Sequence, residues 1–277
     1  MRASTGWVDM PEWPSVVAAE EAVQAWRALG DDKAHLHHAL LLLGKERART
    51  GDCIAAQRAL DEASTLRATG TSPVPRMLAF MFEGHVAVYC GNWQQGLDCL
   101  RSALALARQS GKTRLTCYLL IYLAEAAMLA GRPKVARDYS ETAVREARAC
   151  RAQQYLALAL LAQIEAALGS DDDAAAVAVA AESLALAGRY GMHPIVAAVF
   201  SALALRTGQP FVACHLLGYA LARQTANNAR DMHYAQVLEA LRSEAEASLG
   251  AQVVADLLHA GAQLAADDML ALAAQVA

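Results

Sequence analysis

The sequence predicts an all-α protein, an α-solenoid built from antiparallel helical hairpins. Glycines recur at nearly constant intervals in two interleaved series, and the segments between them carry apolar residues at the three- and four-residue spacing of helices. The first series, whose successive members are almost equally spaced, comprises Gly51, Gly91, Gly131, Gly169 and Gly208. The second series falls about midway, has no member near Arg151, and comprises Gly30, Gly70, Gly111 and Gly191.

Each of these glycines is expected to end a helix. A glycine inside a helix costs about 1 kcal/mol relative to alanine, whereas a C-terminal glycine adopts positive φ without a steric penalty. The residues that follow agree with this prediction. Asp52, Asn92 and Ser170 are residue types that cap the next helix, and Pro133 and Pro210 suit its first turn.

Small residues form three further columns, counted from the first glycine series. Seven residues before each glycine stand Gly44, Gly84, Ala124, Ala162 and Ser201. Five residues after it stand Ala56, Gly96, Ala136, Ala174 and Ala213. Twelve residues after it stand Ala63, Ala103, Ala143, Ala181 and Ala220. We expect these columns to let the two helices of a hairpin, and successive hairpins, approach closely.

The pattern divides the chain into three parts. Residues 1–30 hold an N-terminal segment and an unpaired helix, residues 31–225 hold five repeats, and residues 226–277 form a C-terminal helical cap. The unpaired helix occupies the place of a hairpin's second helix, without a first helix before it. It is either an N-terminal cap or the end of a longer array, and its apolar Val16, Val17, Val23 and Trp26 favour the second alternative.

Composition argues against membrane and nucleic-acid partners. Hydrophobic residues make up 56% of the chain, but the longest apolar stretch contains Glu125 and falls short of the roughly 20 residues that span a bilayer. Residues 1–14 lack the apolar centre of a signal peptide, so we expect a cytoplasmic protein. A net charge of −4 and dispersed arginines indicate no direct contact with nucleic acid.

The cysteines show no metal-binding spacing. The six are Cys53, Cys90, Cys99, Cys117, Cys150 and Cys214. No CxxC pair occurs among them, so we expect small, buried, unpaired side chains in a reducing compartment.

No motif points to catalysis, and we expect no enzyme, no cofactor and no metal. Gly111-Lys112-Thr113 resembles the end of a phosphate loop, but Leu106 stands where the loop needs its first glycine, and a helix precedes it instead of a strand. It is therefore expected to be a helix-ending turn. Nucleophile-elbow and zinc-hydrolase motifs are also absent from the sequence.

Two polar clusters are interpreted without a metal. His35, His37 and His38 crowd the start of one helix and are expected to face solvent, because no further ligand is placed beside them. Three consecutive acids, Asp171 to Asp173, are expected to cap a helix at the positive end of its dipole.

The columns resemble the tetratricopeptide pattern. A small residue, a glycine seven positions later followed by Asp or Asn, and alanines five and twelve positions beyond are typical of that family. The closest match is LLGKERARTGDCIAAQRALDEA at residues 42–63. The resemblance implies a right-handed solenoid in which the first helix of each hairpin lines a concave groove. The family's period is about 34 residues, so the 38- to 40-residue repeats here imply longer helices.

The closing segments resemble those of large bacterial transcriptional regulators. These segments are HLLGYALARQ at 215–224, LRSEAEASLG at 241–250 and HAGAQLAADDMLALAA at 259–274. Such regulators join a DNA-binding domain and a switch ATPase to a helical sensor array. The resemblance implies that this chain corresponds to the sensor array, and the alternative is a stand-alone scaffold or adaptor.

A polar column in the first helices is the candidate binding site. Six residues before the first-series glycines stand Lys45, His85, Glu125 and Gln163, and Ala202 follows in the last repeat. Flanking groove positions are His38, Arg49, Tyr89, Tyr118 and Arg206. Polar residues along an apolar groove are suited to binding a protein, a peptide or a small effector, although the column could also be a solvated face without a ligand. The oligomeric state stays open.

Overall fold

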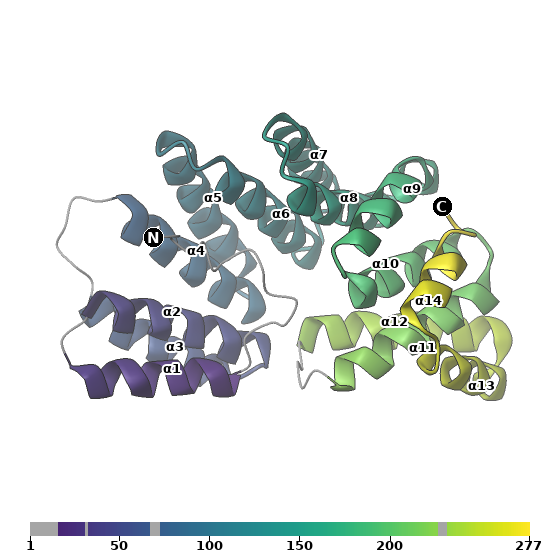
Figure 1. Ribbon diagram of the computed structural model, residues 1–277, viewed down its shortest axis with the longest axis horizontal. Coiled ribbons are helices and arrows are strands. Elements are labelled where there is room, and N and C mark those ends of the chain that lie inside the picture. Colours follow the sequence, from purple (N-terminus) through teal and green to yellow (C-terminus); the bar gives the residue numbers. More distant parts are fainter. Residues whose placement is uncertain (1–15, 31–32, 67–72, 227–231) are drawn as a thin grey trace.

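The computed structural model describes residues 16–30, 33–66, 73–226 and 232–277. Within these ranges every regular element is a helix, and the helices form an arch (Figure 1). The prediction of an all-α solenoid is confirmed. In the described part of the chain, no helix is long and apolar enough to cross a membrane.

Five antiparallel hairpins follow one another at a constant interval along the chain. Their first helices are α2 (Lys33–Arg49), α4 (Pro73–Tyr89), α6 (Thr113–Leu129), α8 (Gln153–Leu168) and α10 (His193–Arg206). Their second helices are α3 (Cys53–Thr65), α5 (Trp93–Gln109), α7 (Pro133–Ala149), α9 (Asp173–Arg189) and α11 (Pro210–Ala226). The first helices all begin at equal spacing, and Gly208 comes early because α10 is shorter than α2, α4 and α6.

Left-handed residues end the helices at even spacing from Gly91 to Gly191. The six positions are Gly91, Gly111, Gly131, Arg151, Asp171 and Gly191, with φ between 55° and 82°. At each turn the left-handed residue donates its N–H to the carbonyl three residues before it, and the next N–H reaches the carbonyl five residues before its own position. Arg151 thus occupies the position at which the second glycine series lacks a member.

The predicted role of Gly169 is wrong. This glycine is right-handed, with φ −65°, and Asp171 takes the left-handed position two residues later. Ser170 does not cap the next helix, since its hydroxyl donates to a carbonyl in α8. Asp172 caps α9 instead, with its carboxylate 3.1 Å from the Ala175 nitrogen, which confirms the capping role expected for the acidic run.

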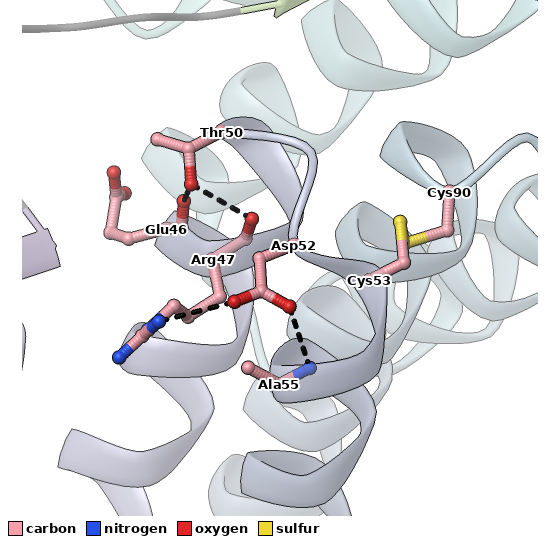
Figure 2. Close-up of a disulfide and its surroundings, with 7 residues drawn as sticks. All are labelled: Glu46, Arg47, Thr50, Asp52, Cys53, Ala55 and Cys90. Atoms are coloured by element: carbon pink, nitrogen blue, oxygen red, sulfur yellow. Dashed lines mark hydrogen bonds and ion pairs between the residues drawn. A yellow bond between two sulfur atoms is a disulfide. The ribbon is translucent and has the colours of Figure 1, made fainter.

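The other predicted caps are confirmed in part. Asp52 accepts a hydrogen bond from the Ala55 nitrogen at 3.0 Å, as Figure 2 shows. Pro133 and Pro210 begin α7 and α11. Asn92 stands at the predicted cap position of α5 but makes no side-chain hydrogen bond to it.

The small columns hold the two helices of a hairpin together. A Cβ added to Gly96 would lie 2.5 Å from Val88 Cγ2, and one added to Gly84 would lie 3.2 Å from the Gly96 carbonyl oxygen. In the last hairpin Ser201 donates to the Ala213 carbonyl at 2.9 Å. The columns are misplaced only in the fourth hairpin, whose left-handed turn residue is Asp171 and not Gly169. The predicted Ala174 and Ala181 are exposed there, and Ala176 and Ser183, two residues later, are buried.

The dispersed arginines bridge successive second helices. Arg108 on α5 contacts Glu146 on α7 at 3.5 Å, and Arg148 on α7 contacts Glu182 on α9 at 2.5 Å. Because these side chains are about half exposed, each pair contributes at most about 1 kcal/mol.

Helix α1 (Val16–Leu29) packs against α2, in the place of a second helix. Val23 is buried there, and Trp26 stacks on His35 with ring centroids 4.5 Å apart. The expectation of solvent-facing histidines holds only for His35. His37 is buried, with Nδ1 2.7 Å from the Ala63 carbonyl oxygen, because the start of α2 packs against α3.

Three further helices close the C-terminal end. They are α12 (Met232–Leu249), α13 (Ala251–Ala262) and α14 (Ala266–Ala273). Helices α11 and α13 meet at their backbones, because a Cβ on Gly218 would lie 2.2 Å from the Leu258 carbonyl oxygen. A Cβ on Gly261 would likewise lie 2.1 Å from the His215 carbonyl oxygen.

Two cysteines are not the unpaired residues that the sequence led us to expect. Cys53, the first residue of α3, is bonded to Cys90, which follows α4, with their Cα atoms 5.7 Å apart (Figure 2). The stacking of the first two hairpins brings the start of α3 next to the end of α4. The spacing of the cysteines along the sequence does not reveal this contact. Cys99, Cys117, Cys150 and Cys214 are free.

Candidate binding face on the first helices

The first helices line the inner side of the arch. Figure 1 shows α4, α6, α8 and α10 inside, with α5, α7 and α9 along the outer edge. Most of the polar column predicted from sequence lies on these helices, where rings of neighbouring first helices are in contact, and we call this set of residues the inner stripe. Its residues are His38, Lys45, Arg49, Phe82, His85, Tyr89, Tyr118, Tyr122, Glu125, Tyr155 and Glu165.

A ladder of rings runs along the inner stripe from α2 to α8. The successive ring centroids are separated by 5.7 Å for His38–Phe82, 6.3 Å for Phe82–His85, 4.1 Å for His85–Tyr122, 4.5 Å for Tyr122–Tyr118 and 6.4 Å for Tyr118–Tyr155. Most of the contacts are edge to face, the arrangement that aromatic quadrupoles favour. Phe82, Tyr122 and Tyr155 were not predicted from the sequence, because they lie outside the polar column and its predicted flanking positions.

His85 lies at the centre of the ladder. Its side chain is 2% exposed, and neither ring nitrogen has a hydrogen-bond partner among the described residues. Desolvation, with a smaller contribution from the charge of Lys45, lowers the pKa of His85 well below the usual histidine range. The ring is therefore neutral near pH 7 and carries one donor and one acceptor, whose lack of partners costs free energy in a buried site.

The α2 end of the stripe carries a buried ionic cluster. Glu46 is fully buried, and its carboxylate lies 2.7 Å from the Arg49 guanidinium and 3.8 Å from Lys45 Nζ. Lys45 Nζ also lies 5.8 Å from the centroid of the Tyr122 ring. The buried Glu46 carboxylate is thus shared between two basic side chains.

The α6–α8 end of the stripe is acidic. Glu125 is half-buried on α6, and Glu165 is exposed on α8. Desolvation, followed by Tyr118, Tyr89 and Glu125, raises the pKa of the Tyr122 hydroxyl. Desolvation by the surrounding helices also raises the pKa of Glu165, although its side chain reaches solvent. Basic side chains therefore lie at the α2 end of the stripe, and acidic side chains lie at its α6–α8 end.

Two predicted site residues do not belong to the stripe as expected. Gln163 lies two residues before the stripe position of α8. The left-handed turn residue of the fourth hairpin is Asp171 and not Gly169, so the column must be counted from Asp171. Glu165, one hairpin after Glu125 in the same register, takes the place assigned to Gln163. Arg206 binds the turn of the preceding hairpin, with its guanidinium 2.9 Å from Asp171 and 3.1 Å from Asp173, and so acts as a structural bridge.

Two surface clefts of about 390 Å³ lie elsewhere. One is lined by α1, α2 and α3, including Arg27 and Arg47, and the other adjoins the Cys53–Cys90 disulfide. Neither contains a residue of the inner stripe, in which Lys45, Arg49, Phe82, His85 and Tyr122 are themselves buried. Among the described residues, no group of three histidines, cysteines or carboxylates is placed to hold a metal ion.

The fold places the chain in the class of helical-repeat arrays related in shape to tetratricopeptide proteins. Among solved structures it is similar to a Rap protein complexed with Competence and Sporulation Factor, with a TM-score of 0.69 and 13% identity over 94% of this chain and 71% of that chain. It is also similar to BtubC (BKLC) from P. vanneervenii, with a TM-score of 0.53 and 15% identity over 85% of this chain and 91% of that chain. No family model matches the sequence, and no curated protein matches it. At these identities the similarity establishes the fold alone.

Proposed function

We propose that this chain is a non-enzymatic interaction module that binds a peptide or an extended protein segment along the inner stripe. The observation that carries the proposal is the continuous ring ladder from α2 to α8, with the unpartnered nitrogens of His85 at its centre. The rings of His38, Tyr118 and Tyr155 are only partly buried and can contact a ligand directly. Aromatic rings with a polar edge supply contact area together with hydrogen bonding, which is the usual chemistry of peptide recognition.

The dimensions of the stripe suit a short extended ligand. Neighbouring helices pack about 8–10 Å apart, so the first helices of four hairpins span roughly 30 Å. An extended chain covers that distance in about nine residues. The ring ladder favours apolar or aromatic ligand side chains, and the exposed Glu165, whose raised pKa of about 7 a neighbouring cation would lower, favours a basic residue at the α8 end.

The neighbouring Rap structure supports this proposal, because that protein is complexed with Competence and Sporulation Factor. By analogy, a peptide or a protein segment is the expected partner of this chain. We propose no direct contact with nucleic acid and no membrane partner.

A selection from a random-peptide library tests the proposal. At pH 8, where Glu165 is ionised in spite of a pKa raised to about 7 by desolvation, peptides selected on the full chain should bind the Glu165→Gln variant at least about tenfold more weakly, because about 1.4 kcal/mol of charge complementarity is lost. The matched control is Glu182→Gln, which removes a carboxylate from an outer helix and should leave the Kd unchanged. Failure to select any peptide, or equal weakening by both variants, would contradict the proposal.

The cellular context that we propose is the sensor region of a bacterial transcriptional regulator in the cytoplasm. It is supported by the resemblance of the three closing segments at 215–224, 241–250 and 259–274. The alternative is a stand-alone scaffold or adaptor. A DNA-binding domain and a phosphate-loop ATPase encoded in the same gene, or in the gene immediately upstream, would support the regulator, and the absence of both would favour the adaptor.

A further inference from the structure

A second pair of sulfur atoms lies in contact. Cys117 Sγ, near the start of α6, is 3.8 Å from Cys150 Sγ, at the end of α7. Cys117 is fully buried, whereas Cys150 is partly exposed in the turn that leads to α8. The two residues are 33 positions apart, close to the separation of 37 in the Cys53–Cys90 disulfide.

We propose that Cys117 and Cys150 form an oxidisable dithiol site that hydrogen peroxide, or another hydroperoxide, converts into a second disulfide. The two sulfurs need to approach by less than about 2 Å to reach the length of a disulfide bond. Side-chain rotation can supply much of that movement at Cys150, which lies outside the helical interior.

The exposures of the two thiols assign their roles. Cys150, which solvent reaches, loses its proton to solvent and attacks one oxygen of hydrogen peroxide as its thiolate. The O–O bond breaks, Cys150 becomes a sulfenic acid, and the hydroxide that leaves takes up a proton from solvent and becomes water. The Cys117 sulfur then attacks the Cys150 sulfur, the S–O bond breaks, and the Cys117 proton leaves with the hydroxide as a second water. The two sulfurs lose two electrons in total, and the peroxide gains them.

The reverse order of attack is disfavoured. Desolvation, with a further contribution from the neighbouring Cys150, raises the pKa of the Cys117 thiol to about 12. A buried thiol that stays protonated reacts slowly with a peroxide in solution. It is nevertheless in place to resolve a sulfenic acid formed on its neighbour.

The site adjoins the inner stripe. The ring centroids of Tyr118, which follows Cys117, and Tyr155 on α8 are 6.4 Å apart. Burial and Tyr118 raise the pKa of Tyr155, and Cys117 and Cys150 lie close enough to add smaller contributions. A Cys117–Cys150 disulfide would tie α6 to the α7–α8 turn directly beside this ring contact.

Peptide mapping of the full chain tests the proposal. After treatment with hydrogen peroxide, alkylation of free thiols and proteolysis without reductant, mass spectrometry should find a Cys117–Cys150 cross-link that lacks two hydrogen atoms. Cys99 and Cys214, which have no sulfur partner in the structure, should remain alkylated and serve as internal controls. A Cys150 that stays alkylated like Cys99, or that pairs only between molecules, would overturn the proposal.

A variant separates the two chemical steps. In Cys117→Ala, Cys150 should stop at the sulfenic acid and be trapped by dimedone, whereas in the wild type the disulfide should form at the expense of the dimedone adduct. The Cys214→Ser control should behave as the wild type does. Equal dimedone labelling of the wild type and Cys117→Ala would show that Cys117 is not the resolving thiol and would overturn the assignment.

Discussion

At the scale of single residues, the turns show how regular backbone geometry overrides residue preference. Arg151 and Asp171 have φ values of 55° and 57°, a conformation that side chains with a Cβ adopt at a cost of about 1–2 kcal/mol. They adopt it because the same pair of backbone hydrogen bonds closes every turn of the array from Gly91 to Gly191. The repeat imposes the conformation even where glycine is missing.

Replacing Arg151 by glycine should therefore stabilise the protein. We expect Arg151→Gly to raise the free energy of unfolding by about 0.5–1 kcal/mol, because relief of the left-handed conformation outweighs the added freedom of the unfolded chain. The matched control is Gly131→Ala, whose Cβ would meet no atom within 4 Å and which should cost about 1 kcal/mol through φ alone. Urea denaturation measures both, and a destabilising Arg151→Gly would count against this explanation.

The buried histidines make stability depend on pH. Desolvation, followed by the charges of His37 and His35, lowers the pKa of His38 from 6.5 to about 4. The unfolded chain therefore binds this proton more readily than the folded chain. The contribution of neutral His38 to stability is fully present above pH 6.5 and is lost as the pH falls towards about 4.

Thermal unfolding between pH 7 and pH 4.5 should show this loss as a falling Tm. The His38→Gln variant, which cannot titrate, should show a shallower fall over the same range. His85, whose pKa is also lowered, contributes in the same direction and remains in both proteins. Parallel pH profiles for the wild type and His38→Gln would exclude His38 as a cause.

At the scale of helices, backbone contact explains two glycines of the closing segments. Gly218 on α11 and Gly261 on α13 each face a carbonyl oxygen of the other helix, at 2.2 Å and 2.1 Å from where a Cβ would stand. Such a separation is far inside van der Waals contact, and backbone atoms cannot turn away as side chains do. The two helices can cross here only without side chains.

We expect Gly218→Ala and Gly261→Ala each to destabilise the protein by about 1–3 kcal/mol, because α11 and α13 must separate. Gly188→Ala is the matched control, since its Cβ would meet only the side chain of Leu270, at 3.2 Å. At position 188 the gain in helix propensity should offset the unfavourable contact with the Leu270 side chain. Guanidinium denaturation compares the three variants, and equal stabilities would rule out the proposed backbone contact.

The Cys53–Cys90 disulfide joins the first two hairpins. Loss of this cross-link in Cys53→Ser/Cys90→Ser should lower the free energy of unfolding by about 2–4 kcal/mol under oxidising conditions. Under reducing conditions the wild type and the variant should have similar stabilities. Cys99→Ser controls for the substitution itself, and a reductant-independent difference would show that packing and not the bond is responsible.

The disulfide also tests the expected cytoplasmic location. Disulfides persist mainly in oxidising compartments, so a protein that works in a reducing cytoplasm should carry free thiols at Cys53 and Cys90 in the cell. Rapid acid quenching followed by thiol labelling would reveal their state. A disulfide present at quenching would contradict a reducing location.

At the scale of the whole molecule, the hairpin order was predictable because glycine spacing and helical periodicity are local signals. The register of the fourth hairpin was not, since the left-handed position is set by turn hydrogen bonds and falls on Asp171, two residues after the available glycine. For the same reason, Glu165 was not among the predicted site residues. The ring contacts of Phe82, Tyr122 and Tyr155, and the disulfide, depend on how neighbouring hairpins stack, which no single repeat encodes.

The arch stacks the first helices side by side (Figure 1). Rings on neighbouring first helices therefore come into contact from α2 to α8. An extended ligand along the inner stripe would contact several hairpins together. Its binding energy would then depend on the whole array and not on one pocket.

Hydrogen exchange measured with and without a library-selected peptide tests this central claim most directly. Binding along the inner stripe should add protection in α2, α4, α6 and α8 and leave α5, α7 and α9 unchanged. Protection confined to the outer helices or to α12–α14 would contradict binding along the inner stripe.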